Sequence, residues 1–371
     1  MRVGLLLEQV LAPVPGGTGR YAAEVAEALA ATGGPGTEVS GWTAWHRDPV
    51  GAVVPGVSGP HRLPLPRRPL VAAWERGPLP APQRVDLVHA PTPLAPLGGR
   101  CPVVVTVHDA VPWTHPETLT PRGVQWHRRM IERAAVSAAA VVVPTEAVGR
   151  ELRRHLTVRC PLVVVGEGVS GRLAPPVDAL DRQAALGVAP GGYLLTTATL
   201  EPRKGLDVLV GALAEAGAPD LPLVVVGQPG WGGVDVPALV AAAGLPAGRV
   251  RALGRVPDED LAALLGGAAA LVVPSRAEGF GLPVLEGMAA GVPVVTSDDP
   301  ALVEVGGGAT VVSPVADRAA LAAALCRVVG DEELRRDLVR RGRVRAADFS
   351  WHGSATHLWQ LYRELLPTGA G

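Results

Sequence analysis

Two clusters of charged residues in the second half of the chain have the types and spacing to bind an anion. The first is Glu201-Pro202-Arg203-Lys204-Gly205, in which two adjacent cations follow an apolar run. An arginine offers a planar fork of N–H donors and a lysine offers a compact ammonium, so the pair suits a diphosphate. The alternative is a solvated basic turn. Lys204 counts against that alternative because it is the only lysine among 34 lysine and arginine residues.

The second cluster contains two glutamates, Glu278 and Glu286, separated by seven residues. Pro283 fits the first turn of a helix, where its missing N–H is not needed. The preceding Gly279-Phe280-Gly281 places backbone N–H groups at the positive end of that helix, which favours an anion. Carboxylates accept hydrogen bonds from sugar hydroxyls. We therefore expect Glu278 before the helix and Glu286 about one turn inside it to face one ligand cleft, rather than to lie on a solvated helix edge.

A glycine cluster in the first half, Gly16-Gly17-Thr18-Gly19-Arg20-Tyr21-Ala22, is predicted to form a loop between the first strand and a helix. Such a loop can face a phosphate or a sugar. It also matches the G-x-G-x-x-A pattern of dinucleotide sites. It follows Leu7 by about nine residues, however, whereas that pattern lies tight against its strand, and Glu38 comes too early to hold a ribose. We favour the anion or sugar loop over an NAD site, and a merely flexible loop stays open.

His108-Asp109 follows the apolar run Val103–Val107 directly. Polar groups just beyond the carboxyl end of a parallel strand point to where ligands bind. His108 is thus a candidate to hydrogen-bond a sugar hydroxyl, and Asp109 a candidate to orient the imidazole ring. A helix-capping role for Asp109 is the alternative.

Several other features receive ordinary structural interpretations. Asp258-Glu259-Asp260 spells the D-x-D pattern of metal-dependent sugar transferases, but Asp258 is expected to cap the helix that follows. The three cysteines are widely spaced and odd in number, which indicates neither a disulfide framework nor a zinc site. The arginines of Arg335–Arg345 alternate with acidic residues and indicate a solvated helix face. A net charge of −1 argues against binding nucleic acid by bulk electrostatics.

Buried strands of parallel sheets must position these groups, because short apolar runs alternate with alanine-rich helical segments. The 371 residues and this βα alternation predict two doubly wound α/β domains. We place the boundary within Gly166–Pro176, giving domains 1–168 and 169–349, with a helix over about 350–371. The predicted strands are Val3–Leu7, Leu87–His89, Val103–Val107, Val141–Val143, Leu162–Val165, Tyr193–Thr197, Leu223–Val226, Val250–Leu253, Leu271–Val273, Val292–Thr296 and Thr310–Val312.

The two halves differ in charge. Residues 1–165 carry a net charge of +5 and residues 166–371 a net charge of −6. The first half also holds the proline-rich stretch Pro49–Pro102, which is either a recognition surface for a variable substrate or a plain long loop. No apolar run reaches the roughly 20 residues of a membrane span, and Glu8 interrupts the N-terminal run too early for a secretory signal. We expect a cytoplasmic protein.

Four motifs in this order resemble the retaining glycosyltransferases of family 4, which have the GT-B fold. They are the Gly16–Tyr21 cluster, His108-Asp109, Glu201–Gly205 and the Glu278–Glu286 block. Phe349-Ser350-Trp351 is similar to the start of the family's terminal helix, which crosses back to the first domain. The resemblance spans nearly the whole chain. It implies two Rossmann-like domains facing a cleft, with a nucleotide-sugar held mainly by the second domain and a hydroxyl acceptor mainly by the first.

The resemblance also implies roles for individual residues. Arg203 and Lys204 would hold the diphosphate, and Glu286 the ribose. Glu278 and the Gly279–Leu282 backbone would contact the donor sugar. The remaining positions are His108 beside the sugar, Gly17 beside the phosphate, Phe280 within the donor-binding backbone, the backbone near Val256 at the base, and Asp109, Tyr21 and Trp113 on the acceptor side.

The chain departs from the family pattern at three positions. Ala198-Thr199 replaces a usual Gly-Arg, so Arg203 would take over the work of one phosphate-binding arginine. Glu167-Gly168-Val169 replaces a usual Asn-Gly-Val, and Gly205 stands at a family asparagine. Because the chain contains no asparagine, these replacements are partly compositional.

The resulting hypothesis is metal-independent transfer of a hexosyl group, with retained anomeric configuration and without a cofactor, in glycan or glycoconjugate biosynthesis. Pro202-Arg203-Lys204 is similar to members that use GDP-mannose, while UDP- and dTDP-sugars stay open, and the acceptor is a glycan, a lipid-linked sugar or a natural product. Alternatives are a non-catalytic nucleotide-sugar-binding module, a phosphorylase or epimerase on the same fold, and an NAD-dependent oxidoreductase. Arg122, Arg128, Arg129 and Arg133 form either a peripheral contact with the inner membrane face or an ordinary amphipathic surface helix.

Overall fold

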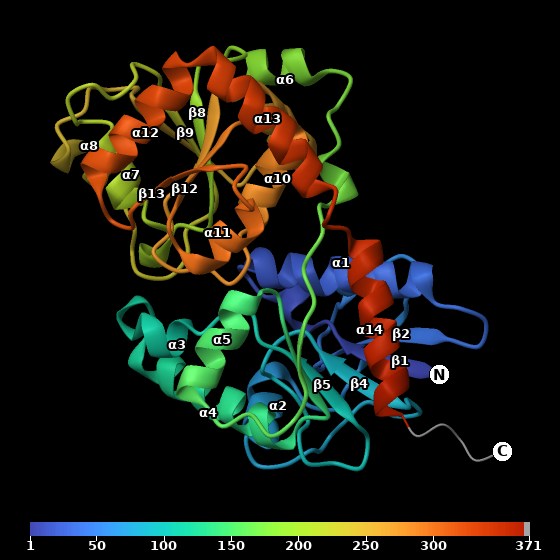
Figure 1. The fold of residues 1–371 in the computed structure, drawn as a ribbon. Helices are drawn as coiled ribbons and strands as arrows, with labels where there is room; N and C mark the ends of the chain where they lie inside the picture. The colour runs from blue at the N-terminus through green and yellow to red at the C-terminus, as the bar shows by residue number, and fades with distance from the viewer. Residues whose placement is uncertain (367–371) are drawn as a thin grey trace. The chain divides into compact units, whose positions relative to one another are not determined.

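The computed structural model describes residues 1–366, which fall into two units, each built on its own sheet. The first unit comprises Met1–Pro116, Thr120–Gly168 and the chain from Ser350 onward. The second comprises Glu117–Leu119 and Val169–Phe349. In Figure 1 the first unit is coloured blue to green except for its last helix, which is red.

The first sheet has seven parallel strands in the order β3-β2-β1-β4-β5-β6-β7. The order changes direction between β1 and β4, and ligands of open parallel sheets bind beyond the carboxyl ends of the strands at such a point. The strands are β1 (Arg2–Leu6), β2 (Glu38–Thr43), β3 (Ser58–Arg62), β4 (Leu87–Ala90), β5 (Val103–Thr106), β6 (Ala140–Val143) and β7 (Leu162–Val164).

Helices connect these strands, and their boundaries follow local capping chemistry. Thr120 accepts a hydrogen bond from the Gly123 N–H at the start of α4, and Thr145 does the same for the Val148 N–H at the start of α5. The helices of this part of the chain are η1 (Glu8–Leu11), α1 (Gly16–Thr32), η2 (Val50–Ala52), α2 (Arg67–Trp74), α3 (Val111–Thr114), η3 (Pro116–Thr118), α4 (Pro121–Ser137), α5 (Glu146–His155) and α14 (Trp351–Leu365).

The second sheet has six parallel strands in the order β10-β9-β8-β11-β12-β13, with its change of direction between β8 and β11. Its strands are β8 (Leu194–Thr197), β9 (Leu223–Val226), β10 (Val250–Gly254), β11 (Ala270–Val273), β12 (Val294–Ser297) and β13 (Val311–Ser313). Its helices are η4 (Gly171–Leu173), α6 (Ala179–Ala185), η5 (Pro202–Lys204), α7 (Leu206–Ala212), α8 (Val236–Ala242), α9 (Asp258–Gly267), α10 (Leu282–Ala290), α11 (Pro300–Gly306), α12 (Arg318–Gly330) and α13 (Glu332–Ala346).

Both faces of the second sheet are covered, which confirms the prediction from its continuous apolar runs. Leu271 and Val273 of β11 join one hydrophobic cluster, while Ala270 and Val272 join another. Successive side chains of a strand point to opposite faces, so a strand buried on both faces must be apolar at every position. This is why the sequence of β11 reads as an unbroken apolar run. The predicted fold class of two Rossmann-like parallel-sheet domains is confirmed.

All eleven predicted strands are present within one or two residues, but β2 and β3 are additional. β2 contains Ser40, Gly41 and Trp42, and β3 contains Gly59 and Pro60, so neither has the apolar run of a buried strand. β3 lies at the edge of its sheet and most of its residues are exposed. Edge strands tolerate proline and polar residues, which explains why the sequence pattern did not predict β3.

The last helix of the described chain, α14, packs in the first unit against α1, as predicted for the terminal helix. The indole N–H of Trp359 donates to the Leu29 carbonyl oxygen of α1 at 3.2 Å. The Tyr362 hydroxyl lies 2.5 Å from Nδ1 of His89, a buried residue of β4. The predicted helix over about 350–371 is described as Trp351–Leu365, and residues 367–371 lie outside the described part.

The arginine-rich helix α4 uses its side chains within the protein. Arg128 Nε donates to the carbonyl oxygen of Pro112 at 2.8 Å, and Arg133 Nη1 donates to that of Trp74 at 2.6 Å. These contacts favour an ordinary amphipathic surface helix over a membrane-binding patch. Among residues 1–366, none of the helices combines the length and apolar character needed to cross a bilayer.

Candidate active site

The Glu201–Gly205 segment lies at the carboxyl edge of the second sheet, between β8 and α7. Arg203 and Lys204 belong to the short helix η5, and Gly205 turns the chain into α7 with a left-handed φ of 69°. A Cβ atom at Gly205 would lie 2.1 Å from the carbonyl oxygen of Pro274, the residue after β11. Only glycine allows this approach, so the replacement of a family asparagine at this position has a structural reason besides composition.

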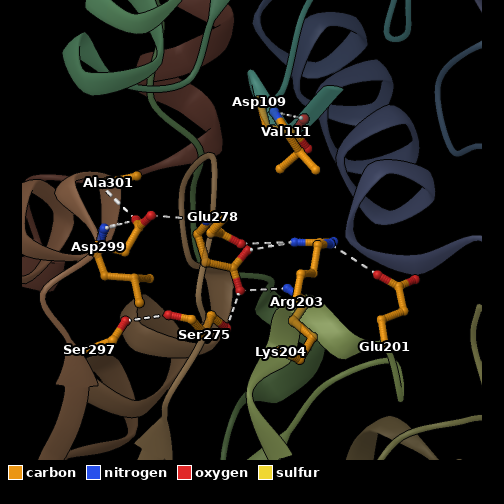
Figure 2. Close-up of polar contacts among 12 residues, drawn as sticks. Asp109, Val111, Glu201, Arg203, Lys204, Ser275, Glu278, Ser297, Asp299 and Ala301 are labelled. Atoms are coloured by element: carbon orange, nitrogen blue, oxygen red, sulfur yellow. Dashed lines mark hydrogen bonds and ion pairs between the residues drawn. The ribbon is translucent and has the colours of Figure 1, made fainter. Parts of the chain in front are cut away.

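The close approach brings Arg203 and Lys204 against the segment that carries Glu278. Lys204 Nζ donates to Glu278 Oε1 at 2.5 Å, and Arg203 Nη1 donates to Glu278 Oε2 at 3.2 Å (Figure 2). Ser275 Oγ also donates to Glu278 Oε1, at 2.7 Å. Arg203 Nε donates in addition to Glu201 Oε2 at 3.0 Å. One carboxylate therefore joins two cations and a hydroxyl at the point where the strand order changes direction.

Burial makes this charge cluster electrostatically strong. The Glu278 side chain is 7% exposed and that of Lys204 15% exposed. Burial alone would raise the pKa of Glu278, but Lys204 and Arg203 outweigh it and lower that pKa to about 2. Burial and the neighbouring Arg203 lower the pKa of Lys204, while Glu278 acts in the opposite direction. Glu278 is thus a carboxylate at neutral pH, held as the counter-charge of both cations.

A second carboxylate, Asp299, supports Glu278 through the backbone. Asp299 Oδ2 accepts from the Glu278 N–H at 3.2 Å, and its Oδ1 accepts from the Ala301 and Leu302 N–H groups at the start of α11. Burial, together with the charge of Glu278, raises the pKa of Asp299 to about 6, although the backbone N–H donors lower it. Asp299 therefore fixes the loop that carries Glu278 and titrates close to neutrality.

Helix α10 begins where the sequence predicted, immediately after Gly279-Phe280-Gly281. Gly281 is its N-cap with a φ of 96°, and Pro283 lies in its first turn. A Cβ atom at Gly281 would lie 2.4 Å from Leu302 Cδ2, so glycine is required here too. Phe280 is buried and packs edge-to-face on Phe349 at 5.5 Å between ring centroids. Glu286 is buried within α10, whereas Glu278 lies in the loop before it.

The start of α9, just after Val256, differs from the prediction in one respect. Val256, between β10 and α9, is half-buried against the core of the second unit. The N-cap of α9 is Pro257, with no side-chain cap, so the predicted capping by Asp258 is wrong. Asp258 lies one position too late to cap and instead stands in the first helical turn, where a carboxylate is favoured by the helix dipole. Asp260 pairs with Arg182 Nη1 at 2.7 Å.

The residues of the D-x-D pattern do not form a metal cage with other side chains. Within residues 1–366, no three or more histidine, cysteine, aspartate or glutamate side chains gather as metal ligands would. The three cysteines, Cys101, Cys160 and Cys326, are free thiols.

In the first unit, His108 follows β5 and is held by two protein groups. Its Nε2 lies 2.8 Å from the Pro91 carbonyl oxygen, and its Nδ1 lies 3.6 Å from Glu167 Oε1. The Tyr21 ring packs edge-on against the imidazole with centroids 4.7 Å apart. The expectation that Asp109 orients His108 is wrong. Asp109 accepts instead from the Val111 N–H at 3.1 Å, because α3 begins two residues later and needs its first N–H groups satisfied.

The glycine cluster is part of α1 and not a loop before it, which corrects the prediction for Gly16–Ala22. Gly17 is exposed in the first helical turn, and Gly19 packs so closely that a Cβ would lie 2.5 Å from Pro15 Cβ. η1 occupies the long connection from β1, and therefore the tight strand–turn–helix of a dinucleotide site is not formed. Trp113 lies in α3 and stacks on His155 at 6.0 Å.

The structure thus brings together Arg203, Lys204 and Glu278 in the second unit, and His108 and Tyr21 in the first. The sequence assigned no role to Glu167, Ser275 or Asp299. Asp299 had one available signal, since an aspartate before Pro300 directly after a strand is typical of a capped helix start. The only signal at Glu167 was its departure from the family's asparagine. Nothing in the neighbouring sequence shows that Glu167 lies beside His108 at the edge of the sheet.

Two family models match the chain. Residues 15–170 match the model described as Glycosyltransferase Family 4, and residues 180–345 match the one described as Glycosyl transferases group 1. The O-antigen chain mannosyltransferase B of Escherichia coli is 32% identical over 268 residues, covering 71% of this chain and 70% of the relative. A phosphatidyl-myo-inositol mannosyltransferase of Mycolicibacterium smegmatis is 31% identical, covering 85% of this chain and 82% of the relative.

Solved structures agree with the fold. Sucrose-phosphate synthase from Thermosynechococcus elongatus superposes with a TM-score of 0.80 at 25% identity and covers all of both chains. The HepE protein of Anabaena, solved with UDP and glucose, superposes with a TM-score of 0.77 at 19% identity and covers 98% of this chain and 100% of that one.

Proposed function

The chain belongs to the family 4 glycosyltransferases, and from that premise we propose that it transfers a hexose, with mannose favoured, from a nucleoside diphosphate sugar to a hydroxyl acceptor. We propose further that the anomeric configuration is retained and that no metal takes part. Mannose is favoured because the similar proteins of Escherichia coli and Mycolicibacterium smegmatis are named mannosyltransferases. GDP is favoured because Pro202-Arg203-Lys204 is similar to the motif of members that use GDP-mannose.

The observation that carries the proposal is the pairing of Arg203 and Lys204 with Glu278 at the carboxyl edge of the second sheet. Two mostly buried cations that share the Glu278 carboxylate, with Glu201 as a second partner of Arg203, can accept a diphosphate and keep Glu278 as an acceptor for sugar hydroxyls. The start of α10 adds N–H groups and a positive helix end to the same segment.

The proposed chemistry needs few protein groups. The bond between the anomeric carbon and the diphosphate oxygen breaks, and a bond from the acceptor oxygen forms on the same face. The hydroxyl proton passes to the departing phosphate. Arg203, Lys204 and the α10 start neutralise the charge that develops on the leaving group, and preorganised stabilisation of that kind is usually the largest catalytic contribution. These fixed cations would do the work that a divalent ion does elsewhere.

The other assignments follow the family positions and are proposals of the same kind. Glu286 would bind the ribose and the backbone at Val256 the base. The Gly279–Leu282 backbone and His108 would contact the transferred sugar. Gly17, exposed in the first turn of α1, keeps its proposed place beside phosphate, and Asp109, Tyr21 and Trp113 theirs on the acceptor side. The acceptor is proposed to be a glycan, a lipid-linked sugar or a natural product.

A donor panel tests this proposal directly. Thermal unfolding is followed with GDP-mannose, UDP-glucose, dTDP-glucose, GDP and NAD, each with EDTA and with added Mg²⁺. A true donor at 100 times its Kd stabilises the protein by about 2.7 kcal/mol. We expect GDP-mannose and GDP each to raise Tm, and each by the same amount in EDTA as with added Mg²⁺. Stabilisation by NAD alone, or only with the metal, would overturn the proposal.

Product analysis separates transfer from related chemistry. With the stabilising donor and a mixture of glycan or lipid-linked acceptors, NMR of the product identifies the anomeric configuration. Formation of an epimerised nucleotide sugar, or release of a sugar phosphate, would assign a different reaction. Donor binding without any turnover would indicate the non-catalytic module.

A further inference from the structure

The imidazole of His108 lies between two groups of the first unit that only accept hydrogen bonds. Nε2 is 2.8 Å from the Pro91 carbonyl oxygen, and Nδ1 is 3.6 Å from a carboxylate oxygen of Glu167. A carbonyl oxygen cannot donate, so Nε2 must carry a hydrogen. If Nδ1 carried none, its lone pair would face the carboxylate between two mostly buried side chains, where an unpaired polar contact is unfavourable.

Glu167 is held in this place by the terminal helix. Its side chain is 5% exposed, and the chain on either side of it is anchored to α14. Ser354 Oγ donates to the Gly166 carbonyl oxygen at 2.6 Å, and a Cβ atom at Gly168 would lie 2.2 Å from the Trp351 backbone nitrogen. The backbone that carries the carboxylate thus cannot move away from His108 without displacing the start of α14.

We propose that Glu167 is a positioning residue that keeps a proton on Nδ1 of His108, so that both N–H groups of His108 are directed to protein acceptors and the ring meets the sugar as a fixed cation and not as a base. The part that concerns the sugar rests on the proposed function, whereas the part that concerns the proton does not. Glu167 touches no reacting atom itself. Where the family has an asparagine, whose amide can donate or accept, this chain has a group that only accepts.

The charged and titratable groups around His108 favour its protonated form. Burial lowers the pKa of His108, but Glu167, the Pro91 carbonyl and Asp109 more than reverse this, and the net shift is upward. His89 of β4 stays neutral, because burial and the charge of His108 lower its pKa to about 3. The Tyr21 hydroxyl points to Thr106 Oγ1 at 3.1 Å and so does not compete for the imidazole.

The first test measures the proton without any substrate. In full-length protein labelled on histidine nitrogens, His108 is assigned by its loss in His108→Gln, and its pKa is followed by NMR. We expect the wild-type pKa of His108 to lie above the ordinary 6.5, so that both nitrogens stay protonated to a higher pH than in an ordinary histidine. In Glu167→Gln the pKa of His108 should be lower than in wild type, because burial is then less opposed.

A matched control distinguishes a local effect from a general loss of negative charge. Glu151→Gln removes the same charge from the same unit, where Glu151 pairs with His155 at 2.9 Å on α5. It should leave the pKa of His108 unchanged. A wild-type His108 pKa at or below 6.5, or a His108 pKa that is the same in Glu167→Gln, would overturn the proposal.

The second test reads the consequence for turnover, with the donor identified by the stabilisation panel. Glu167→Gln should lower kcat about 10- to 100-fold, with little change in KM for the donor, since the positive charge that Glu167 holds on His108 beside the reacting sugar is lost. The falling alkaline limb of the kcat–pH profile should move to lower pH together with the NMR value. A lowered Tm with an unchanged pH profile would show a structural role only and would overturn the proposal. If neither protein transfers sugar while the NMR shift is present, the proposed function fails and the proton assignment stands.

Discussion

Lys204, the chain's only lysine, donates from Nζ to Glu278 Oε1 at 2.5 Å, although 74 residues separate the two in the sequence. The contact depends on Gly205, which lets η5 approach the strand end that leads to Glu278. A compact ammonium on a flexible stem fits beside Arg203 in this nearly buried place, whereas a second planar guanidinium requires more room. This is a physical reason for a lysine in a chain that otherwise uses arginine.

The first prediction concerns that cation. Lys204→Ala should lower transfer by about 100- to 1,000-fold, because preorganised charge at the leaving diphosphate is lost. Lys204→Arg, which keeps the charge but enlarges the head group, should still lose about 10-fold or more. Initial rates at saturating donor measure both. Arg182→Ala removes a surface cation of the same unit and should leave the rate unchanged, and wild-type rates in Lys204→Arg would refute the steric explanation.

The second prediction concerns stability in acid. The pKa of Glu278 falls from its ordinary 4.5 to about 2 in the folded protein, so the folded state binds fewer protons than the unfolded state in that window. The contribution of ionised Glu278 to the free energy of unfolding, about 3 kcal/mol, is therefore present above pH 4.5 and is lost as the pH falls toward 2. In Glu278→Gln this component should disappear.

Urea unfolding between pH 2 and 6 measures how the free energy of unfolding changes with pH in wild type and in Glu278→Gln. Glu259→Gln, at an acidic residue in the first turn of α9, serves as the charge control and should keep the wild-type slope in this window. Parallel stability curves for wild type and Glu278→Gln would contradict the buried ion pair.

The third prediction has the opposite sign. Burial raises the pKa of Asp299 from 3.8 to about 6, so between these values the folded protein binds more protons than the unfolded chain. This group therefore lowers stability as the pH rises from 4 to 6, by up to about 3 kcal/mol. Asp299→Asn should remove that decline, and comparison of its urea midpoints with wild type at pH 4 and 7 measures the effect. If both proteins change alike over this range, Asp299 does not titrate as inferred.

Most strands of the two sheets and the Arg203-Lys204 pair could be predicted from the sequence, because each depends on a short local pattern. Continuous Val and Leu runs such as that of β11 indicate buried strands. Because Lys204 follows β8 closely, its position at the carboxyl edge of the sheet could be predicted. β3 was not predicted because an edge strand need not be apolar. β2 lies inside the sheet between β3 and β1, and it was not predicted because Ser40 and Gly41 interrupt its apolar run. The Gly16–Ala22 cluster was wrongly predicted to be a loop because glycines compatible with a loop also permit close helix packing.

The side-chain partners were less predictable than the positions. That Glu167, and not the adjacent Asp109, faces His108 depends on which strand ends are neighbours and on how α14 anchors the chain after β7. Such pairings join residues far apart in sequence, and nothing in the local pattern of either residue encodes them. The same holds for Asp299, whose carboxylate reaches the Glu278 N–H across 21 positions.

The last prediction tests the glycine on which the Lys204 contact depends. Gly205→Ala must place a Cβ at a left-handed φ and 2.1 Å from the Pro274 carbonyl oxygen, so that either the backbone shifts or η5 moves away from β11. We expect a loss of about 3 kcal/mol or more in the free energy of unfolding, from backbone strain together with the clash. Gly266→Ala is the matched control, since Gly266 lies in α9 with no atom near its Cβ position, and it should stabilise the protein by about 0.5–1 kcal/mol. Urea unfolding measures both variants, and donor-induced stabilisation should be lost only in Gly205→Ala, because Lys204 is displaced there. Equal stability of Gly205→Ala and wild type would mean that the turn does not need glycine and that another feature sets the position of Lys204.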